Sequence, residues 1–446
     1  MSTQAYRDDR AHVFHSWSAQ RALAPAVVTG GEGAWFWTED GTRYLDFSSQ
    51  LVNLNLGHQH PALVEAIQRQ AATLCTVAPP FANDVRGEAA RLIAEVAPGD
   101  LNHVFFTNGG TEANEHAVRM ARLATGRHKV LSTYRSYHGA TTASISLTGD
   151  PRRWPNETGT SGIVHFFGPY PYRSPFYSDS AEQEGERALA HLEEVFTLEG
   201  PHTIAAVVLE TVVGTNGILV PPDGYLAGVR ALCDRHGVML ICDEVMSGFG
   251  RCGEWFAVDR WNVVPDLITF AKGVNSGYVP LGGVLVGERI YEAFADRAYP
   301  GGLTYSGHPL ACAPAVATVQ VMRDDNINER VRRLGEEVVR PRLEKIRDRH
   351  PSVGDVRGLG LFWAVDLVKD RTTKEPFNVP QDKFNKRPTV VDAVVGEMNK
   401  RGVSVMGWVS HLVIAPPLIV TEEQIDEAVT ALDAALAVAD AKIAAA

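Results

Sequence analysis

The chain has 446 residues and a formal net charge of −11, with 45% hydrophobic and 21% charged residues. Its length exceeds the roughly 250–300 residues at which a single hydrophobic core stops growing, and its composition is that of an ordinary globular protein. The negative charge argues against general nucleic-acid binding, which needs lysine and arginine to neutralise phosphates. No stretch approaches the roughly 18 apolar residues of a membrane helix. We therefore expect neither nucleic acid nor membrane as a partner.

The cysteines are odd in number and lie far apart. There are five of them, with no CxxC motif and no histidine at metal-binding spacing. This pattern predicts neither a disulfide framework nor a metal site. The first ten residues are polar and lack the apolar segment of a signal peptide. Together these features predict a cytoplasmic protein.

The two ends of the chain share a pattern of short strands and helices. Residues 35–45 resemble a hairpin with Asp40-Gly41 at its turn, and the residues after about 325 combine long helices with short strands. We predict that residues 1–70 and 326–446 form the N-terminal and C-terminal parts of one smaller α+β domain. Residues 71–325 would then form a separate, larger domain.

The middle of the chain alternates apolar runs with amphipathic helical patterns, as in a mostly parallel sheet covered by helices. The clearest strands are predicted at residues 104–106, 204–209, 238–242 and 267–270. The sequence therefore predicts an α/β fold. Two irregular stretches, residues 149–179 and 370–388, are predicted to be long loops of the kind that often border sites.

A glycine turn follows the first predicted strand. Residues 107–114 contain Gly109, Gly110 and Thr111 and lead into an amphipathic helix. Glycines let the backbone approach a ligand, and the free N–H groups of the helix start bind anions such as phosphate. The alternative is a plain tight turn with a threonine cap.

Two further segments follow apolar strands. Tyr137, in residues 134–139, offers a ring on which a flat cofactor could stack, although a half-buried loop tyrosine is the simpler interpretation. Asp243 and Glu244 follow residues 238–242 directly. A buried aspartate requires a cation or several donors, so either a structural ion pair or a protonated ligand nitrogen would satisfy it.

Lys272 ends the apolar strand at residues 267–270 and is surrounded by small residues. Lysine is rarely buried without a reason. A desolvated lysine has a lowered pKa and can act as a Schiff-base nucleophile and then as a proton carrier. The alternative is a side chain that extends to solvent. An anion-binding turn, an aromatic platform, an aspartate and a lysine are together what pyridoxal 5′-phosphate (PLP) requires.

The motifs at residues 108–113, 137–139, 243–245, 248–251 and 271–273 resemble those of class III aminotransferases of PLP fold type I, over nearly the whole chain. The resemblance implies a phosphate site at Gly110 and Thr111, a ring enclosed by Tyr137 and Val245, a pyridinium partner in Asp243 and a Schiff base at Lys272. It also implies a place in the cofactor site for His138 and Glu210.

The resemblance further implies a homodimer, with dimers of dimers left open, in which Thr304 reaches the neighbour's phosphate. It suggests Trp17, Leu51 and Phe81 as substrate-pocket residues. Within the family the chain is most similar to the ω-amine:pyruvate branch. Many relatives have a carboxylate-binding arginine where this chain has Met406. We therefore expect another group to hold the carboxylate, and a shift toward less acidic, apolar amines.

The expected reaction moves an amino group from an ω-amino acid, or from a primary or aromatic amine, to pyruvate or a similar keto acid. The amine displaces Lys272, which carries a proton to the cofactor and leaves pyridoxamine phosphate, and a keto acid then reverses these steps. An aminomutase, racemase or decarboxylase on the same scaffold is the alternative. Residues 248–253 match GxGxxG and would instead suggest a nicotinamide oxidoreductase, but the strand and helix context of that fingerprint is missing. Arg152, Arg153, Arg332 and Arg333 occur only as pairs and are predicted to be solvated surface residues.

Overall fold

The computed structural model describes residues 3–156 and 159–444. At its centre is a seven-stranded sheet in the order β4-β10-β9-β8-β7-β5-β6. The strands of this sheet are β4 (His103–Thr107), β5 (Lys129–Thr133), β6 (Ile163–Phe166), β7 (Ile204–Glu210), β8 (Met239–Asp243), β9 (Leu267–Phe270) and β10 (Gly282–Val286).

Five neighbouring strands of this sheet, β6, β5, β7, β8 and β9, run parallel. β10 runs antiparallel to both β9 and β4. All residues of β7, β8 and β9 are buried, which explains their continuous apolar runs. The predicted α/β fold with a mostly parallel central sheet is confirmed.

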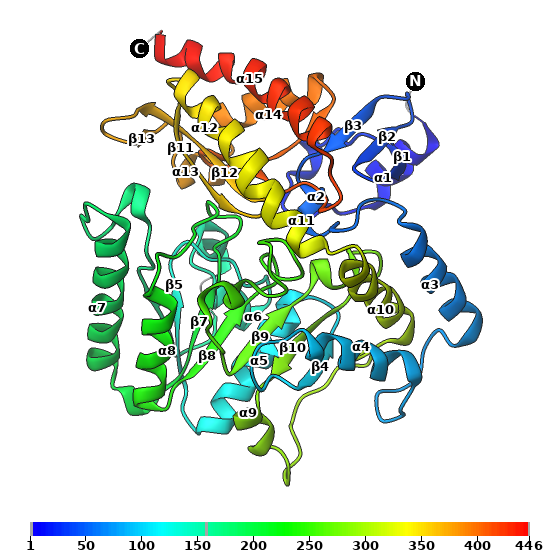
Figure 1. The fold of residues 1–446 in the computed structure, drawn as a ribbon, viewed down its shortest axis with the longest axis vertical. Helices are drawn as coiled ribbons and strands as arrows, with labels where there is room; N and C mark the ends of the chain where they lie inside the picture. The colour runs from blue at the N-terminus through cyan, green and yellow to red at the C-terminus, as the bar shows by residue number, and fades with distance from the viewer. Residues whose placement is uncertain (1–2, 157–158, 445–446) are drawn as a thin grey trace.

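Helices cover both faces of the sheet (Figure 1). Alternate residues of the strands supply two separate apolar clusters, because successive side chains of a strand point to opposite faces. α5 (Gly110–Thr125) packs against β9 and β10, and α8 (Tyr225–His236) packs against β8. The other helices of this part are α3 (Pro61–Thr73), α4 (Asp84–Glu95), α6 (Thr142–Leu147), α7 (Ala181–Glu199), α9 (Glu288–Glu292) and α10 (Pro309–Asp324).

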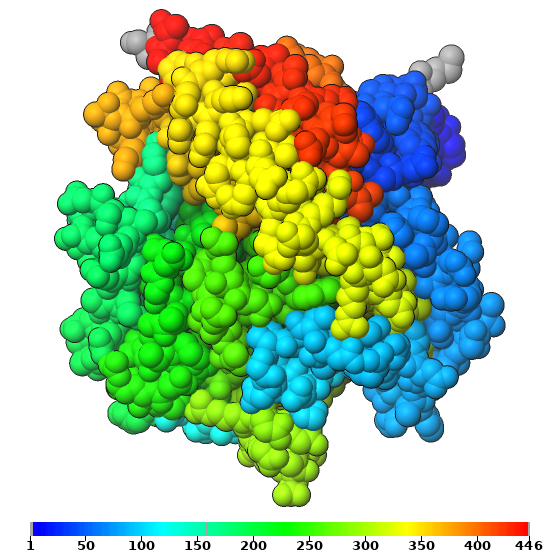
Figure 2. Space-filling model, in the orientation of Figure 1, coloured from blue at the N-terminus to red at the C-terminus, as the bar shows by residue number. Residues whose placement is uncertain are grey.

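The two ends of the chain build one sheet together. Its strands are β1 (Val28–Glu32), β2 (Trp35–Thr38), β3 (Arg43–Asp46) and β14 (Val403–Ser404). β2 and β3 form the predicted hairpin, and β14 pairs parallel with β3. Figure 2 shows the consequence on the surface, where N-terminal residues in blue lie beside C-terminal residues in red. The smaller α+β part built from both chain ends is therefore confirmed.

A third sheet contains β11 (Val353–Leu359), β12 (Phe362–Asp370), β16 (His411–Ile414) and β15 (Met406–Trp408), with β13 (Glu375–Pro376) paired to β12. The helices of the chain ends are α1 (Gln4–His12), α2 (Ser49–Val52), α11 (Ile327–Arg333), α12 (Arg340–Arg349), α13 (Pro380–Phe384), α14 (Val390–Lys400) and α15 (Glu422–Ala444). Among the residues with described positions, no helix is long and apolar enough to cross a membrane.

The two predicted loops contain short elements. Residues 149–179 include η2 (Pro151–Asn156), β6 and η3 (Pro171–Arg173), and residues 370–388 include β13 and α13. These elements span two to six residues, which is too short to leave a readable periodicity. Residues 248–253 lie in turns between β8 and η5 (Ala257–Trp261), without the helix that a nucleotide-binding fingerprint requires.

Candidate active site

Three ionisable side chains meet where adjacent parallel strands end. Glu210 at the end of β7 pairs in register with Asp243 at the end of β8, and Asp243 pairs with Thr269 of β9. Lys272 begins the short helix η6 (Lys272–Asn275), separated from the end of β9 by one residue. Because neighbouring parallel strands end at the same edge of a sheet, the three side chains line one cavity of about 280 Å³. The start of α5 closes its other side.

Asp243 is buried and satisfied by three donors. His138 Nδ1 and Asn114 Nδ2 each lie 2.8 Å from its Oδ2, and the Val245 amide donates to its Oδ1 at 3.0 Å. Asn114 also donates to the His138 carbonyl at 2.8 Å. These bonds fix the orientation of the carboxylate. A buried Asp243 was predicted to need a cation or several donors, and these three bonds supply the donors. The role of Asn114 as one of them was not predicted.

His138 takes part in this network through only one of its two ring nitrogens, Nδ1. Burial works to lower its pKa, but the hydrogen bond and charge of Asp243 outweigh burial and raise the pKa above the usual value. Its buried Nε2 has no hydrogen-bond partner among the described residues. His138 lines the cavity, and a buried polar atom without a protein partner is compatible with a polar ligand or water as its partner.

Lys272 is held in a strained and desolvated position. Its φ of 47° lies in the left-handed region, which residues with a Cβ rarely occupy and which tends to occur at functional sites. Burial lowers the pKa of its amine to about 8, although the charges of Asp243 and Glu210 oppose that shift. The amine is therefore far more nucleophilic near neutral pH than an exposed lysine.

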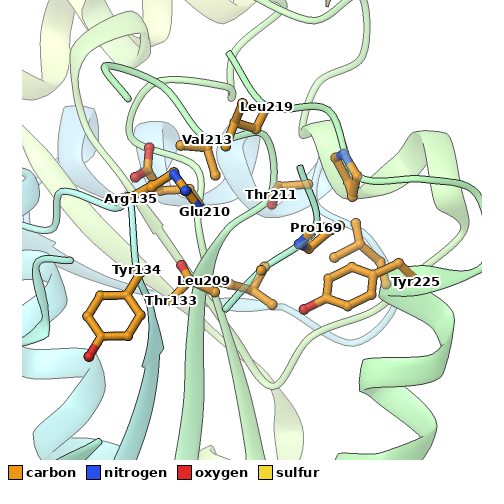
Figure 3. A pocket seen from close by; sticks show the side chains of 13 residues that line it. Thr133, Tyr134, Arg135, Pro169, Leu209, Glu210, Thr211, Val213, Leu219 and Tyr225 are labelled. Carbon is orange, nitrogen blue, oxygen red and sulfur yellow. The ribbon is translucent and has the colours of Figure 1, made fainter. Parts of the chain in front are cut away.

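Glu210 connects the cavity to the loop that carries Tyr137. Its carboxyl accepts hydrogen bonds from the Tyr137 amide at 2.9 Å and the Gly214 amide at 2.7 Å. Burial raises its pKa to about 7. Glu210 also lines a second, small cavity of about 30 Å³ beside the ends of β5 and β7 (Figure 3). Its position therefore supports a role in holding the Tyr137 loop.

The start of α5 has the features of a phosphate site. Gly110 and Thr111 lie in its first turn, where backbone N–H groups have no partner within the helix. A Cβ at Gly110 would lie 2.7 Å from Val245 Cγ2, so this close approach requires glycine. Tyr137 and Val245 both line the same cavity. Anion donors, flat walls, a fixed carboxylate and a free amine all suit PLP, so the residues present fit the cofactor.

A larger cavity of about 880 Å³ adjoins the first and shares Tyr137, Met246 and Lys272 with it. Three of the predicted substrate residues, Trp17, Leu51 and Met406, line this outer cavity.

Two predicted site residues lie elsewhere. Phe81 does not line either cavity within the described part of the chain and is 64% exposed. Thr304 is exposed as well and also lies outside both cavities. The single chain therefore brings neither residue into its own site.

Arg152 was predicted to be a solvated surface residue, and this prediction is wrong. Its guanidinium lies 3.7 Å from the centre of the Tyr137 ring and 4.7 Å from that of Trp408, inside the outer cavity. Its Nε donates to Asp150 Oδ2 at 2.9 Å. One indication of this position was available in the sequence, because Arg152 lies in the predicted long loop 149–179, close in sequence to Tyr137.

Comparisons with known proteins agree with this geometry. The family model "Aminotransferase class-III" matches residues 17–436. A putrescine–pyruvate aminotransferase from Pseudomonas aeruginosa is 34% identical, with 95% of this chain and 93% of that protein covered.

Two solved structures are also similar. The taurine:2-oxoglutarate aminotransferase from Bifidobacterium kashiwanohense, in complex with PLP and glutamate, is 40% identical with a TM-score of 0.94 over 98% of both chains. An (S)-enantioselective ω-transaminase from Thermomicrobium roseum is 37% identical with a TM-score of 0.91, over 97% of this chain and 98% of that one.

Proposed function

The chain belongs to the class III aminotransferases, which use PLP and have PLP fold type I, and we propose that its preferred amino donor is an ω-amino acid with an acidic group. Taurine and β-alanine are donors of this chemical class. The acceptor would be pyruvate or a similar keto acid. The observation that carries the proposal is the position of Arg152 in the same cavity as Lys272.

We assign the cofactor to the cavity of about 280 Å³. The α5 start at Gly110 and Thr111 would hold the phosphate, while Tyr137 and Val245 would enclose the ring. When bound, PLP supplies an electron sink for negative charge at the amine-bearing carbon of the substrate. Asp243, fixed by its three donors, would keep the pyridine nitrogen protonated by charge pairing in a largely dry site.

Lys272 has two roles in this proposal. It would anchor the cofactor as a Schiff base, and after the substrate amine replaces it, its Nζ would take a proton from the amine-bearing carbon of the substrate and deliver it to the cofactor. A pKa of about 8 suits this role, because a general base works best when its pKa lies near the working pH.

Basic side chains in the outer cavity support an acidic substrate. Five basic residues and one acidic residue line it, although the whole chain carries a net charge of −11. The basic residues are Arg152, Lys272, Lys383, Lys386 and Arg387, and the acidic one is Asp392. Arg152, Lys383 and Arg387 pair with Asp150, Asp392 and Asp382, and Lys272 serves the cofactor. The position of Arg152 beside Lys272, rather than a net excess of charge, therefore argues against the preference for less acidic, apolar amines that Met406 suggested.

Arg152 is the best placed of these groups to receive the substrate's acid. Asp150 and the Tyr137 ring hold its guanidinium, which reduces the entropy lost when an anion binds. A planar guanidinium also matches carboxylate and sulfonate groups with paired hydrogen bonds. In this proposal Arg152 takes the place of the arginine that is absent at Met406.

A panel of donors tests the substrate class. Purified enzyme is assayed with pyruvate and, in turn, taurine, β-alanine, a neutral aromatic amine and the diamine putrescine. The proposal predicts the highest kcat/KM for an acidic donor and the lowest for the diamine. A higher kcat/KM for putrescine than for both acidic donors would contradict it.

We also propose a homodimer, with Thr304 reaching the phosphate of the neighbouring subunit. Exposed apolar side chains support a buried contact surface, because large apolar patches usually mark interfaces. They include Phe14, Trp17, Leu51, Phe81 and Tyr305. Sedimentation of the purified protein tests this proposal, and a monomer at micromolar concentration would contradict it.

We propose the domain limits 1–70, 71–325 and 326–446, with α3 (Pro61–Thr73) crossing the first of them. The separate sheets formed by the chain ends and by the middle of the chain support this division. We further propose a cytoplasmic location, which the five free cysteines support.

A further inference from the structure

A buried cluster of charges lies where the C-terminal sheet meets the loops of the central sheet. Arg357 of β11 donates to Asp366 of β12 at 2.9 Å. Arg173 of η3 donates to both oxygens of the same carboxylate, at 2.8 and 2.9 Å. The Tyr170 hydroxyl donates to the same carboxylate at 3.1 Å. The Asp366 side chain is only 1% exposed. Its charge is therefore fully paired by groups from both parts of the molecule.

Arg357 also bonds the loop that carries Thr215, a residue of the outer cavity wall. Its Nε donates to the Gly217 carbonyl at 2.7 Å, and one terminal nitrogen donates to Asp355 Oδ2 at 2.7 Å. Gly217 belongs to residues 213–219, which follow β7 and which we call the 213–219 loop; Val213 and Leu219 pair at its base. Thr215 of this loop lines the outer cavity.

A second bond attaches the same loop to His411 of the C-terminal sheet. His411 Nε2 lies 2.9 Å from the Thr215 carbonyl, and burial lowers the pKa of His411 to about 4, so the neutral ring donates. His411 of β16 pairs in register with Trp408 of β15, and Met406 and Trp408 line the outer cavity. The 213–219 loop is thus attached at two carbonyls to the sheet that carries the facing cavity wall.

The approach of Arg357 depends on Gly217. A Cβ at Gly217 would lie 2.9 Å from a terminal nitrogen of Arg357, and the φ of 127° at Gly217 is strained for any other residue. The loop conformation and the position of the guanidinium are therefore matched to each other. A generic surface contact would not need such a match.

We propose that Arg357 is a positioning residue for substrate selection, which sets the separation between the Thr215 wall and the Met406–Trp408 wall of the outer cavity. Its guanidinium joins Asp366 of the C-terminal sheet to the 213–219 loop after β7. Arg357 does not line either cavity and has no part in the chemical step. The inference rests on the proposed function of the outer cavity as the substrate site.

The main test replaces Arg357 by methionine and measures both half-reactions. We expect KM for an acidic donor to rise by about 3- to 10-fold through lost loop positioning. The visible absorbance of bound cofactor and kcat at saturating donor should change by less than about twofold, since the cofactor cavity stays intact. Arg357→Lys keeps the charge but not the fork of donors, and it should restore KM only in part.

Two further variants keep the result interpretable. Arg342→Met removes the same charge from a surface pair with Asp426 and should leave KM unchanged. Gly217→Ala leaves every charge in place and displaces only the loop, so it should raise KM even if Arg357→Met fails to fold.

The outcomes separate the inference from the proposed function. A lower melting temperature with unchanged KM in both Arg357→Met and Gly217→Ala would show a purely structural role and overturn the inference. An equal rise of KM in Arg342→Met would overturn it as well. If wild-type enzyme fails to prefer acidic donors, the proposed function fails instead, and that result is visible before any variant is made.

Discussion

The cofactor cavity and the outer cavity share Lys272 but are built in different ways. The cofactor cavity takes its ionisable groups from the ends of adjacent buried strands, β7, β8 and β9. The outer cavity takes its walls from Trp17 and Leu51, η2, the segment 380–392 and β15. The first therefore has a fixed geometry set by strand register. The second is assembled from short elements and connecting segments distant in the sequence, where specificity can change without disturbing the chemistry.

Lys272→Ala tests the inner cavity and should have the largest effect. Loss of the amine removes both the anchor of the cofactor and the proton carrier, so kcat should fall by at least about 10²–10⁴-fold. Steady-state kinetics with saturating PLP measures this fall in kcat. Lys129→Ala, which removes an amine paired with Glu199 outside both cavities, is the matched control and should retain activity.

Asp243→Asn should have the next largest effect. The neutral amide cannot stabilise a protonated ring nitrogen, and kcat should fall by about 10²–10³-fold while the protein remains folded. Asp234→Asn, at an exposed carboxylate of α8, controls for the loss of a charge. Unchanged kcat in Asp243→Asn would mean that the ring nitrogen does not face this residue.

Arg152→Gln tests the outer cavity. A charged hydrogen bond contributes about 1.5–3 kcal/mol, so KM for an acidic donor should rise by about 10- to 100-fold. KM for a neutral amine should hardly change. Arg153→Gln, on the same η2 segment but outside the cavity lining, is the control. Equal effects on acidic and neutral donors would show that Arg152 supports the loop rather than the substrate.

The pH dependence of cofactor reloading should show the smallest effect. Only the neutral Lys272 amine attacks the cofactor, and its pKa is lowered to about 8 from 10.5. Below about pH 8 the rate at which apoenzyme regains visible absorbance should therefore rise about tenfold per pH unit, and above pH 8 it should level off. A rate that keeps rising beyond pH 9 would show a lysine that is not desolvated.

The difference between the two cavities also explains what the sequence could predict. Asp243 and Lys272 each follow an apolar run, and the rule that parallel strands end at one edge was enough to bring them together. β6 and β10 were not foreseen, because β6 lies within the irregular stretch 149–179 and β10 begins with Gly282 and Gly283, and glycine is depleted in strands. Asn114 was not foreseen either, because its role appears only once α5 packs beside β8.

The outer cavity was only partly predictable for the same reason. Trp17, Leu51 and Met406 were found through resemblance to a family, not through any local pattern. Arg152 was assigned to the surface because a pair of arginines in an irregular loop looks solvated. Only the folded chain brings Asp150, Tyr137 and Trp408 around it.

The most direct test of the central claim is the visible absorbance of PLP-loaded enzyme during each half-reaction. The account predicts that an amine donor without keto acid bleaches the band in proportion to the enzyme sites present, and that pyruvate then restores it. A band that stays unchanged with every donor, or bleaches without returning, would contradict transamination at the cavity of Lys272 and Asp243.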